Sequence, residues 1–212
     1  CSCWVHVDVM EGYYMMDWGA TSGRMFRLRI IFDDPEFEIT DDAQTTTLTA
    51  VNQGQNATPI NGWYHIVGTY DSATDTASVF VDGVLQASPT DAAFTPLESS
   101  AQPFAIGARA TGSNPINAKL FQAAIWDTVL DSDQISTLYN SGNGGTYSDL
   151  ITEQIGTNPT STNLHAWWKL ENTDDADGGT YNLTNNNSVT FTAGYNDNAA
   201  TYNGSNSLSV AD

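Results

Sequence analysis

Two glutamates, Glu36 and Glu38, are the residues whose spacing comes closest to an acid–base pair. On a β-strand, side chains two residues apart point to the same face, so both carboxylates would share one surface. Glycoside hydrolases use two carboxylates on either side of the scissile bond. No third acid accompanies this pair, and a solvated strand face explains it better. We therefore predict that the chain is not an enzyme, and glycoside hydrolysis is the least favoured function.

Acidic loops could hold calcium, which binds carboxylate and backbone carbonyl oxygens. Asp174, Asp175 and Asp177 lie in one such loop, and they are the expected ligands of a calcium ion. The loop differs from a helix–loop–helix calcium site, because the twelfth position counted from Asp174 is Asn185 and not a glutamate. Solvated turns are the alternative interpretation. The other acidic turns are residues 33–34 and 41–42.

Aromatic rings that lie near side-chain amides are typical of sugar-binding sites, where the rings stack on pyranose faces and the amides bond hydroxyl groups. The candidate residues for such a carbohydrate site are Tyr13, Tyr14, Trp18, Asn114 and Asn117. Packing in the core is the alternative role for each aromatic ring.

The charge balance limits the kinds of partner. The 212 residues include 25 acidic and 6 basic side chains, which gives a formal net charge of −19. A field of this sign repels phosphate groups, so we expect no binding of nucleic acid. The chain has no run of about 18 apolar residues, so we expect no insertion into a membrane. Hydrophobic residues make up 40% of the chain, which is enough for a packed core.

Alternation of apolar and polar residues is the main structural signal, and it predicts β-strands. In residues 26–30, for example, Phe26, Leu28 and Ile30 alternate with two arginines. The predicted strands are residues 3–9, 26–30, 45–51, 63–70, 77–81, 104–106, 120–126, 166–170, 182–184, 189–191 and 207–210, with turns such as 33–35 and 82–83 between them. Many short strands favour an all-β sandwich. A capping box of Asp131 and Gln134 predicts one short helix over residues 132–140.

Several segments in combination resemble the laminin-G-like domains of the concanavalin A-like fold. They are GWYHIVGTYD at residues 62–71, ASVFVDG at 77–83, FAIG at 104–107, and the closing strand and helix at 120–140. The resemblance implies a jelly roll of two antiparallel sheets, and the segments are most similar to modules of phage and other virion surface proteins. Relatives often carry calcium on an acid of the closing strand. Phe121 or Gln122 holds that position here.

The order of the segments differs from the family pattern. Residues 164–170 resemble its first strand, and residues 202–210 resemble the strand that normally precedes residues 1–9. We therefore divide the chain into a main part at 1–150, a linker at 151–163, and strands at 164–212 that complete the same domain or a neighbouring copy. Three explanations stay open: a circular permutation, a fragment of a tandem array, or strand donation between copies.

Strand donation has a physical motive. A separate block of strands would expose apolar surface and open strand edges, which must be covered. The residues of this expected assembly surface are Trp167, Trp168, Leu170, Phe191 and Val210. We therefore expect a non-catalytic extracellular or virion surface module that assembles with copies of itself. The alternative is a lectin-like adhesion module that binds surface glycans.

Overall fold

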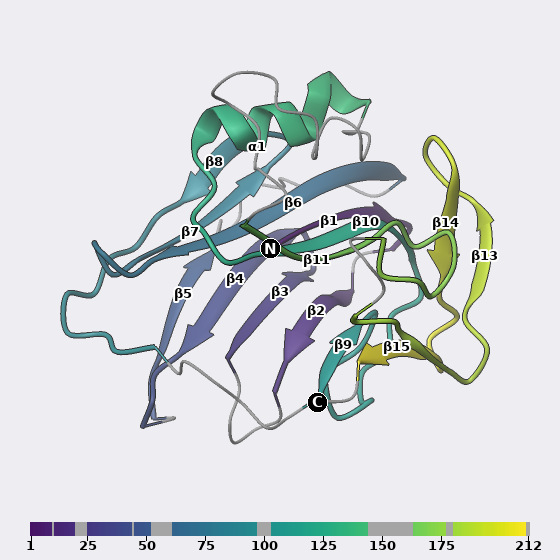
Figure 1. The fold of residues 1–212 in the computed structure, drawn as a ribbon, viewed down its shortest axis with the longest axis horizontal. Helices are drawn as coiled ribbons and strands as arrows, with labels where there is room; N and C mark the ends of the chain where they lie inside the picture. Colours follow the sequence, from purple (N-terminus) through teal and green to yellow (C-terminus); the bar gives the residue numbers. More distant parts are fainter. Residues whose placement is uncertain are drawn as a thin grey trace.

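The computed structural model describes residues 1–9, 11–19, 25–43, 45–51, 61–96, 103–143, 163–176 and 180–210. Its strands form two antiparallel sheets, named sheet A and sheet B, which pack face to face (Figure 1). The described ranges also include one short α-helix and a turn of 3-10 helix that follows it. The predicted all-β, two-sheet sandwich with one short helix is confirmed.

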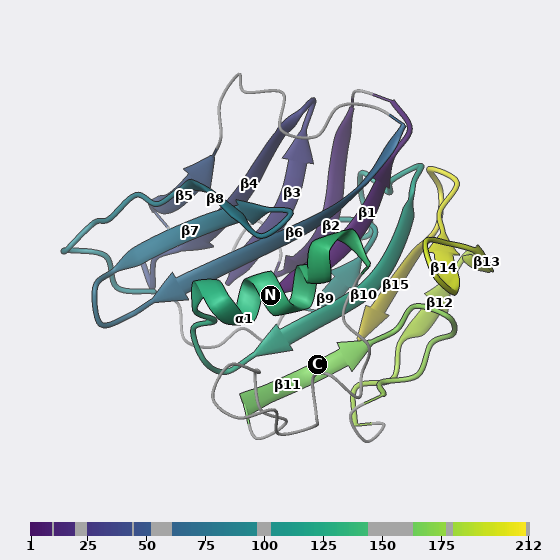
Figure 2. The same ribbon diagram turned by 90° about the horizontal axis from the view of Figure 1, so that it is seen from above.

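Sheet A has eight strands. Along its main path they are β13 (Thr190–Ala193), β14 (Asn198–Thr201), β10 (Lys119–Trp126), β1 (Ser2–Val7), β6 (Gly62–Asp71), β7 (Thr76–Val81) and β8 (Val84–Ala87), and β11 (Leu164–Trp168) also pairs with β10. Helix α1 (Ser132–Tyr139) lies on the outer face of this sheet, away from sheet B (Figures 1 and 2). No helix in the described part of the chain is long and apolar enough to cross a membrane.

Helix α1 begins at the predicted capping box. The backbone N–H of Gln134 donates to the Asp131 carboxylate over 2.8 Å, and the backbone N–H of Asp131 donates to Gln134 Oε1 over 2.9 Å. The buried residues Ile135 and Leu138 fasten the helix to the outer face of sheet A. The α-helix ends at Tyr139, one residue earlier than predicted, because Asn140 adopts a positive φ. A 3-10 turn follows at Asn140–Gly142.

Sheet B has seven strands. Their order is β12 (Thr184–Asn186), β15 (Ser207–Val210), β9 (Phe104–Ile106), β2 (Gly12–Trp18), β3 (Phe26–Ile31), β4 (Asp34–Thr40) and β5 (Thr47–Val51). Period-two alternation decides which side chains enter the core. Leu28 and Ile30 are fully buried between the sheets. The arginines that alternate with them, Arg27 and Arg29, lie on the outer face of sheet B.

The last strands of the chain belong to the same two sheets as the first ones. Strands β11 and β14 pair with β10 in sheet A, and β15 pairs with β9 in sheet B. Trp167, Trp168 and Leu170, three residues of the expected assembly surface, are at most 1% exposed. Phe191 and Val210 are partly buried against the core. One chain thus covers the apolar surface that motivated assembly, and exchange of strands between copies stays a prediction.

In sheet B, strand β2 was not predicted, and β4 was considered only as the strand face that carries Glu36 and Glu38. In β2 a bulge shifts the register between Tyr14 and Met16, so the apolar residues do not alternate regularly. The turn expected at residues 33–35 lies one residue earlier, because Ile31 pairs with Asp34 and the hairpin turns at Phe32 and Asp33. Pro35 lies inside β4.

Candidate functional site

A shallow groove of about 580 Å³ lies on the outer face of sheet B, over the N-terminal half of β2. Among the described residues it is lined by Glu11, Gly12, Tyr14, Ile31, Asn114, Pro115, Asn117, Asn203 and Gly204. Three of the five predicted carbohydrate residues, Tyr14, Asn114 and Asn117, therefore meet in one place. We name this feature the β2 groove.

Three segments that are distant in sequence form the β2 groove. Gly12 pairs with Ile31 on the neighbouring strand β3. On the other side, the loop after β9 follows β2, because the Gly107 N–H donates to the carbonyl of Met15 over 3.1 Å. The turn before β15 closes the end, because the Gly204 N–H donates to the carbonyl of Ile116 over 2.8 Å. The C-terminal part of the chain thus contributes directly to the site.

The floor of the β2 groove is open because Gly12 has no side chain. Among the described residues, a Cβ atom added at this position would have only Ile31 Cδ1 nearby, at 3.5 Å, which is an ordinary van der Waals contact. Gly12 is not among the residues with positive φ, so its backbone accepts other amino acids. The absence of a side chain therefore creates space, and it is not needed for the strand to form.

The polar groups of the β2 groove differ in how free they are. Asn114 and Asn117 are exposed, and their amides have no hydrogen-bond partner in the described part of the chain. Asn203 is different, because its Oδ1 accepts from the Ser205 N–H over 3.0 Å and from the Ser205 hydroxyl over 2.8 Å. Glu11 is exposed and directly precedes Gly12, the first residue of β2. Two amides and one carboxylate are thus available to a hydroxylated ligand.

Tyr14 is 8% exposed and is held by arginines. The guanidinium carbons of Arg27, Arg29 and Arg109 lie 5.1, 5.8 and 5.9 Å from the centroid of its ring. These are distances at which a cation is attracted to an aromatic face. The ring is therefore fixed in place at the side of the β2 groove.

The two glutamates of β4, Glu36 and Glu38, form ion pairs with two of these arginines. Arg29 Nε lies 2.6 Å from Glu36 Oε2, and Arg29 Nη2 lies 3.5 Å from Glu38 Oε2. Burial works against the charged guanidinium, but the attraction of Glu36 and Glu38 outweighs it and raises the pKa of Arg29. Arg27 Nε lies 3.1 Å from Asp17 Oδ1. The face shared by Glu36 and Glu38 is thus part of an ion-pair network and is not simply solvated.

The other two predicted carbohydrate residues lie outside the β2 groove. Tyr13 is fully buried, and its hydroxyl donates to the carbonyl of Val9 over 2.7 Å. Tyr13 therefore does not meet the other predicted residues, because period-two alternation turns it to the core while its neighbour Tyr14 faces outward. Trp18 lies at the other end of β2, where it contacts Phe26 and Phe104 and lines a separate cavity of about 140 Å³ between the sheets.

The loop expected to bind calcium is braced from within. Asp175 is 5% exposed, and its carboxylate accepts the backbone N–H groups of Trp167 over 3.2 Å and Tyr181 over 3.1 Å. Asp174 accepts a hydrogen bond from the Asn172 amide over 2.9 Å. Asp177 lies outside the described residues. The described residues contain no group of three His, Cys, Asp or Glu that could hold a metal ion. Calcium at this loop stays a prediction.

The second acidic region considered for calcium contains a similarly braced residue. The backbone N–H and hydroxyl groups of Thr45 and Thr46 all donate to the carboxylate of Asp41. These four hydrogen bonds, of which the one from the Thr46 backbone N–H contributes most, lower the pKa of Asp41 to about 2. Asp41 therefore closes the turn between β4 and β5.

Sequence reasoning missed Glu11, Gly12, Asn203 and Gly204 as parts of the site. Glu11 and Gly12 begin a strand that the pattern did not reveal. Asn203 and Gly204 lie in a recognised motif of the family, but their position beside β2 depends on the long-range pairing of β15 with β9. A strand assignment for residues 12–18 would have revealed the first two.

The two sheets and the short helix define a jelly roll of the lectin type. The family model of the concanavalin A-like lectin/glucanases superfamily, in its laminin-G form, matches residues 1–136, and the chain belongs to this superfamily. No curated protein matches the chain. The predicted laminin-G-like resemblance is thus confirmed.

Solved structures show the same fold at low sequence identity. A candidate carbohydrate-binding protein from Bacteroides ovatus ATCC 8483 has a TM-score of 0.55 and 19% identity, and the match covers 100% of this chain and 53% of that protein. The binding domain of Paraclostridial Mosquitocidal Protein 1 has a TM-score of 0.51 and 14% identity, with 66% and 36% covered. The chain therefore spans about half the length of the first protein and about a third of the second.

Proposed function

We propose that this protein binds carbohydrate without catalysis, in the β2 groove. The observation that carries the proposal is that two amides, Asn114 and Asn117, have no partner among the described residues and lie beside a fixed aromatic ring in an open groove. An amide offers both a donor and an acceptor, which matches the hydroxyl groups of a sugar. The lectin-type superfamily and the assignment of the Bacteroides ovatus protein support the same choice.

The chemistry of the β2 groove favours binding over hydrolysis. Glycoside hydrolysis needs two carboxylates that flank the bond to be cleaved. Glu11 is the one acid among the described lining residues, and the arginines of β3 engage both Glu36 and Glu38. Glycans presented outside cells are the natural targets of such a module, so we place its action in an extracellular setting. A role on a virion surface, and self-association, stay predictions that have less support.

The test fills the floor of the β2 groove. Gly12→Val adds a branched side chain at a position where one atom of the described residues lies within contact distance, and valine suits a strand better than glycine does. We expect the variant to keep the melting temperature of the wild type or to exceed it. Its affinity for the glycans that wild type binds on an array should fall at least tenfold, because the added methyl groups occupy the space of the sugar.

The matched control is Thr47→Val, which adds a valine to an exposed position of β5 in the same sheet, away from the groove. This variant should bind glycans as wild type does. Affinities are measured by isothermal titration calorimetry, and stability by thermal unfolding. A Gly12→Val variant that binds with unchanged affinity would place the site elsewhere. A wild-type protein that gives no saturable signal on the array would refute the proposed function.

A further inference from the structure

The hairpin that joins β3 to β4 carries an aromatic residue in a conformation that suits glycine. Phe32 has a φ of 61°, and Asp33, the second turn residue, does not have a positive φ. This combination is typical of a type II′ turn, whose first central residue is usually glycine. A bulky side chain at positive φ is strained, because its Cβ approaches the backbone.

Nothing in the described part of the chain compensates for this strain by packing. The side chain of Phe32 is 64% exposed, the largest exposure among the large hydrophobic residues, and it makes no ring contact there. Leu170 also has a positive φ, of 63°, but it is fully buried in the core, where packing stabilises it. The hairpin between β7 and β8 uses Asp82 and Gly83, which tolerate positive φ readily.

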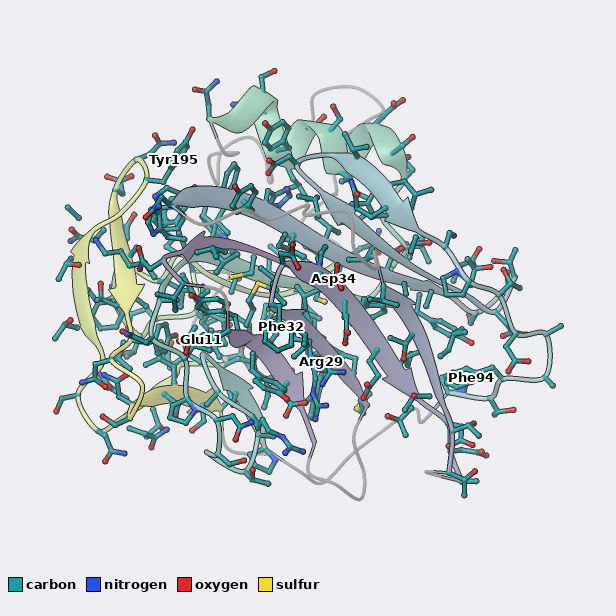
Figure 3. All side chains as sticks on the ribbon, turned by 180° about the vertical axis from the view of Figure 1, so that it is seen from behind. Glu11, Arg29, Phe32, Asp34, Phe94 and Tyr195 are labelled. Atoms are coloured by element: carbon teal, nitrogen blue, oxygen red, sulfur yellow. The ribbon has the colours of Figure 1, made fainter. Side chains whose placement is uncertain are left out.

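Phe32 lies at the edge of the β2 groove. It directly follows Ile31, which lines the groove and pairs with Gly12 on its floor. Extension of this register places Phe32 beside Glu11, the residue before Gly12. Figure 3 shows Phe32 at the end of the hairpin, with Glu11 and Arg29 in the same region of the molecule. The exposed Phe32 is thus adjacent in sequence to one lining residue, Ile31, and in register with another, Glu11.

We propose that Phe32 is the stacking platform of the β2 groove, and that its ring contacts the C–H face of a neutral pyranose whose hydroxyl groups bond to Asn114 and Asn117. This inference rests on the proposed carbohydrate function and names the class of sugar. That class is a pyranose with one apolar C–H face, whose binding requires no charged group. The acidic neighbours Glu11, Asp33 and Asp34 disfavour the other common use of an exposed aromatic ring, which is insertion into an anionic membrane.

The experiment separates stability from binding. Phe32→Gly removes both the ring and the strain, so its melting temperature should rise by about 2–4 °C. Its affinity should fall about tenfold, because the apolar platform is lost. The probe is whichever of lactose, cellotetraose, mannotetraose and xylotetraose wild type binds most tightly in calorimetry. Phe32→Tyr keeps the aromatic face and should restore the affinity, whereas Phe32→Leu should not.

Two controls isolate the two effects. Ser141→Gly relieves another positive φ, of 53°, far along the chain in the 3-10 turn, and should change stability without changing affinity. Leu85→Ala removes a different exposed hydrophobic side chain, which is 51% exposed, and should leave affinity unchanged. The upfield shift that an aromatic ring induces in bound sugar C–H protons should be present in wild type and absent in Phe32→Gly.

The outcomes distinguish the two proposals. If wild type binds a probe and Phe32→Gly binds it equally well, the platform is refuted and the carbohydrate function stands. If Phe32→Gly changes the oligomeric state in sedimentation but not the affinity, Phe32 serves a protein contact and the platform is again refuted. If Gly12→Val binds every probe as wild type does, the groove itself is not the site.

Discussion

At the residue scale, Asn114 and Asn117 of the β2 groove differ from three aspartates elsewhere in the molecule. Asp41, Asp131 and Asp175 all use their carboxylates to close turns, cap a helix or brace a loop. Asn114 and Asn117 have no such internal role in the described part of the chain. Removal of the first group therefore affects stability, whereas removal of the second should affect only what the protein binds.

A residue-scale prediction concerns the pH dependence of stability. His65 is 2% exposed and packs against Trp4 and Tyr139, with ring centroids 5.2 and 6.5 Å away. Burial lowers the pKa of His65 from 6.5 to about 3, because it disfavours the charged imidazolium. The unfolded chain therefore takes up a proton at this residue below about pH 6.5, and the folded chain does so only near pH 3.

The contribution of His65 to stability is fully present above pH 6.5 and is lost as the pH falls toward 3. Between pH 7 and pH 4 this loss amounts to roughly 3 kcal/mol. We expect His65→Phe, which keeps an aromatic ring in the stack, to reduce the acid sensitivity by this amount in urea unfolding. If the free energy of unfolding of the variant falls as steeply with pH as that of the wild type, groups other than His65 cause the loss of stability in acid.

At the element scale, the strands that the sequence revealed are those with regular alternation. Residues 104–106 and 207–210 were predicted with the correct bounds, and Cys3, Val5 and Val7 face the core as expected. The alternation predicted to continue to Val9 stops at Val7, and Val9 is 45% exposed. Strand β2 escaped prediction because its bulge breaks the period of two. The site depends on this strand, so the same irregularity concealed Glu11 and Gly12 as lining residues.

The element-scale prediction concerns the C-terminal strands. Trp168, Leu170 and Leu208 are at most 1% exposed in the core formed with the first part of the chain. Loss of one large core side chain costs about 3–5 kcal/mol, and a domain has only about 5–15 kcal/mol in total. We expect a chain that ends at Asn143 to show no cooperative thermal transition in circular dichroism. A sharp transition would show that residues 1–143 fold as an independent unit.

At the scale of the whole molecule, the sequence predicted the kind of fold but not where the site would form. The combination of motifs was sufficient for the laminin-G-like resemblance, and their order led to the prediction that residues 164–212 complete the same domain or a neighbouring copy. The β2 groove, however, combines residues 11–14, residue 31, residues 114–117 and residues 203–204. No local sequence pattern predicts that these segments lie together, because their proximity depends on the order of β15, β9, β2 and β3 in sheet B.

Carbohydrate binding in the β2 groove is the central claim, and nuclear magnetic resonance tests it most directly. Backbone amide signals of the ¹⁵N-labelled protein are followed during titration with the oligosaccharide that binds most tightly. We predict saturable shifts concentrated at Gly12, Ile31, Asn114, Asn117 and Gly204, with little change at Trp4 and Tyr195 on the outer face of sheet A. Saturable shifts confined to sheet A, or no shifts with any oligosaccharide that the array identifies, would contradict this claim.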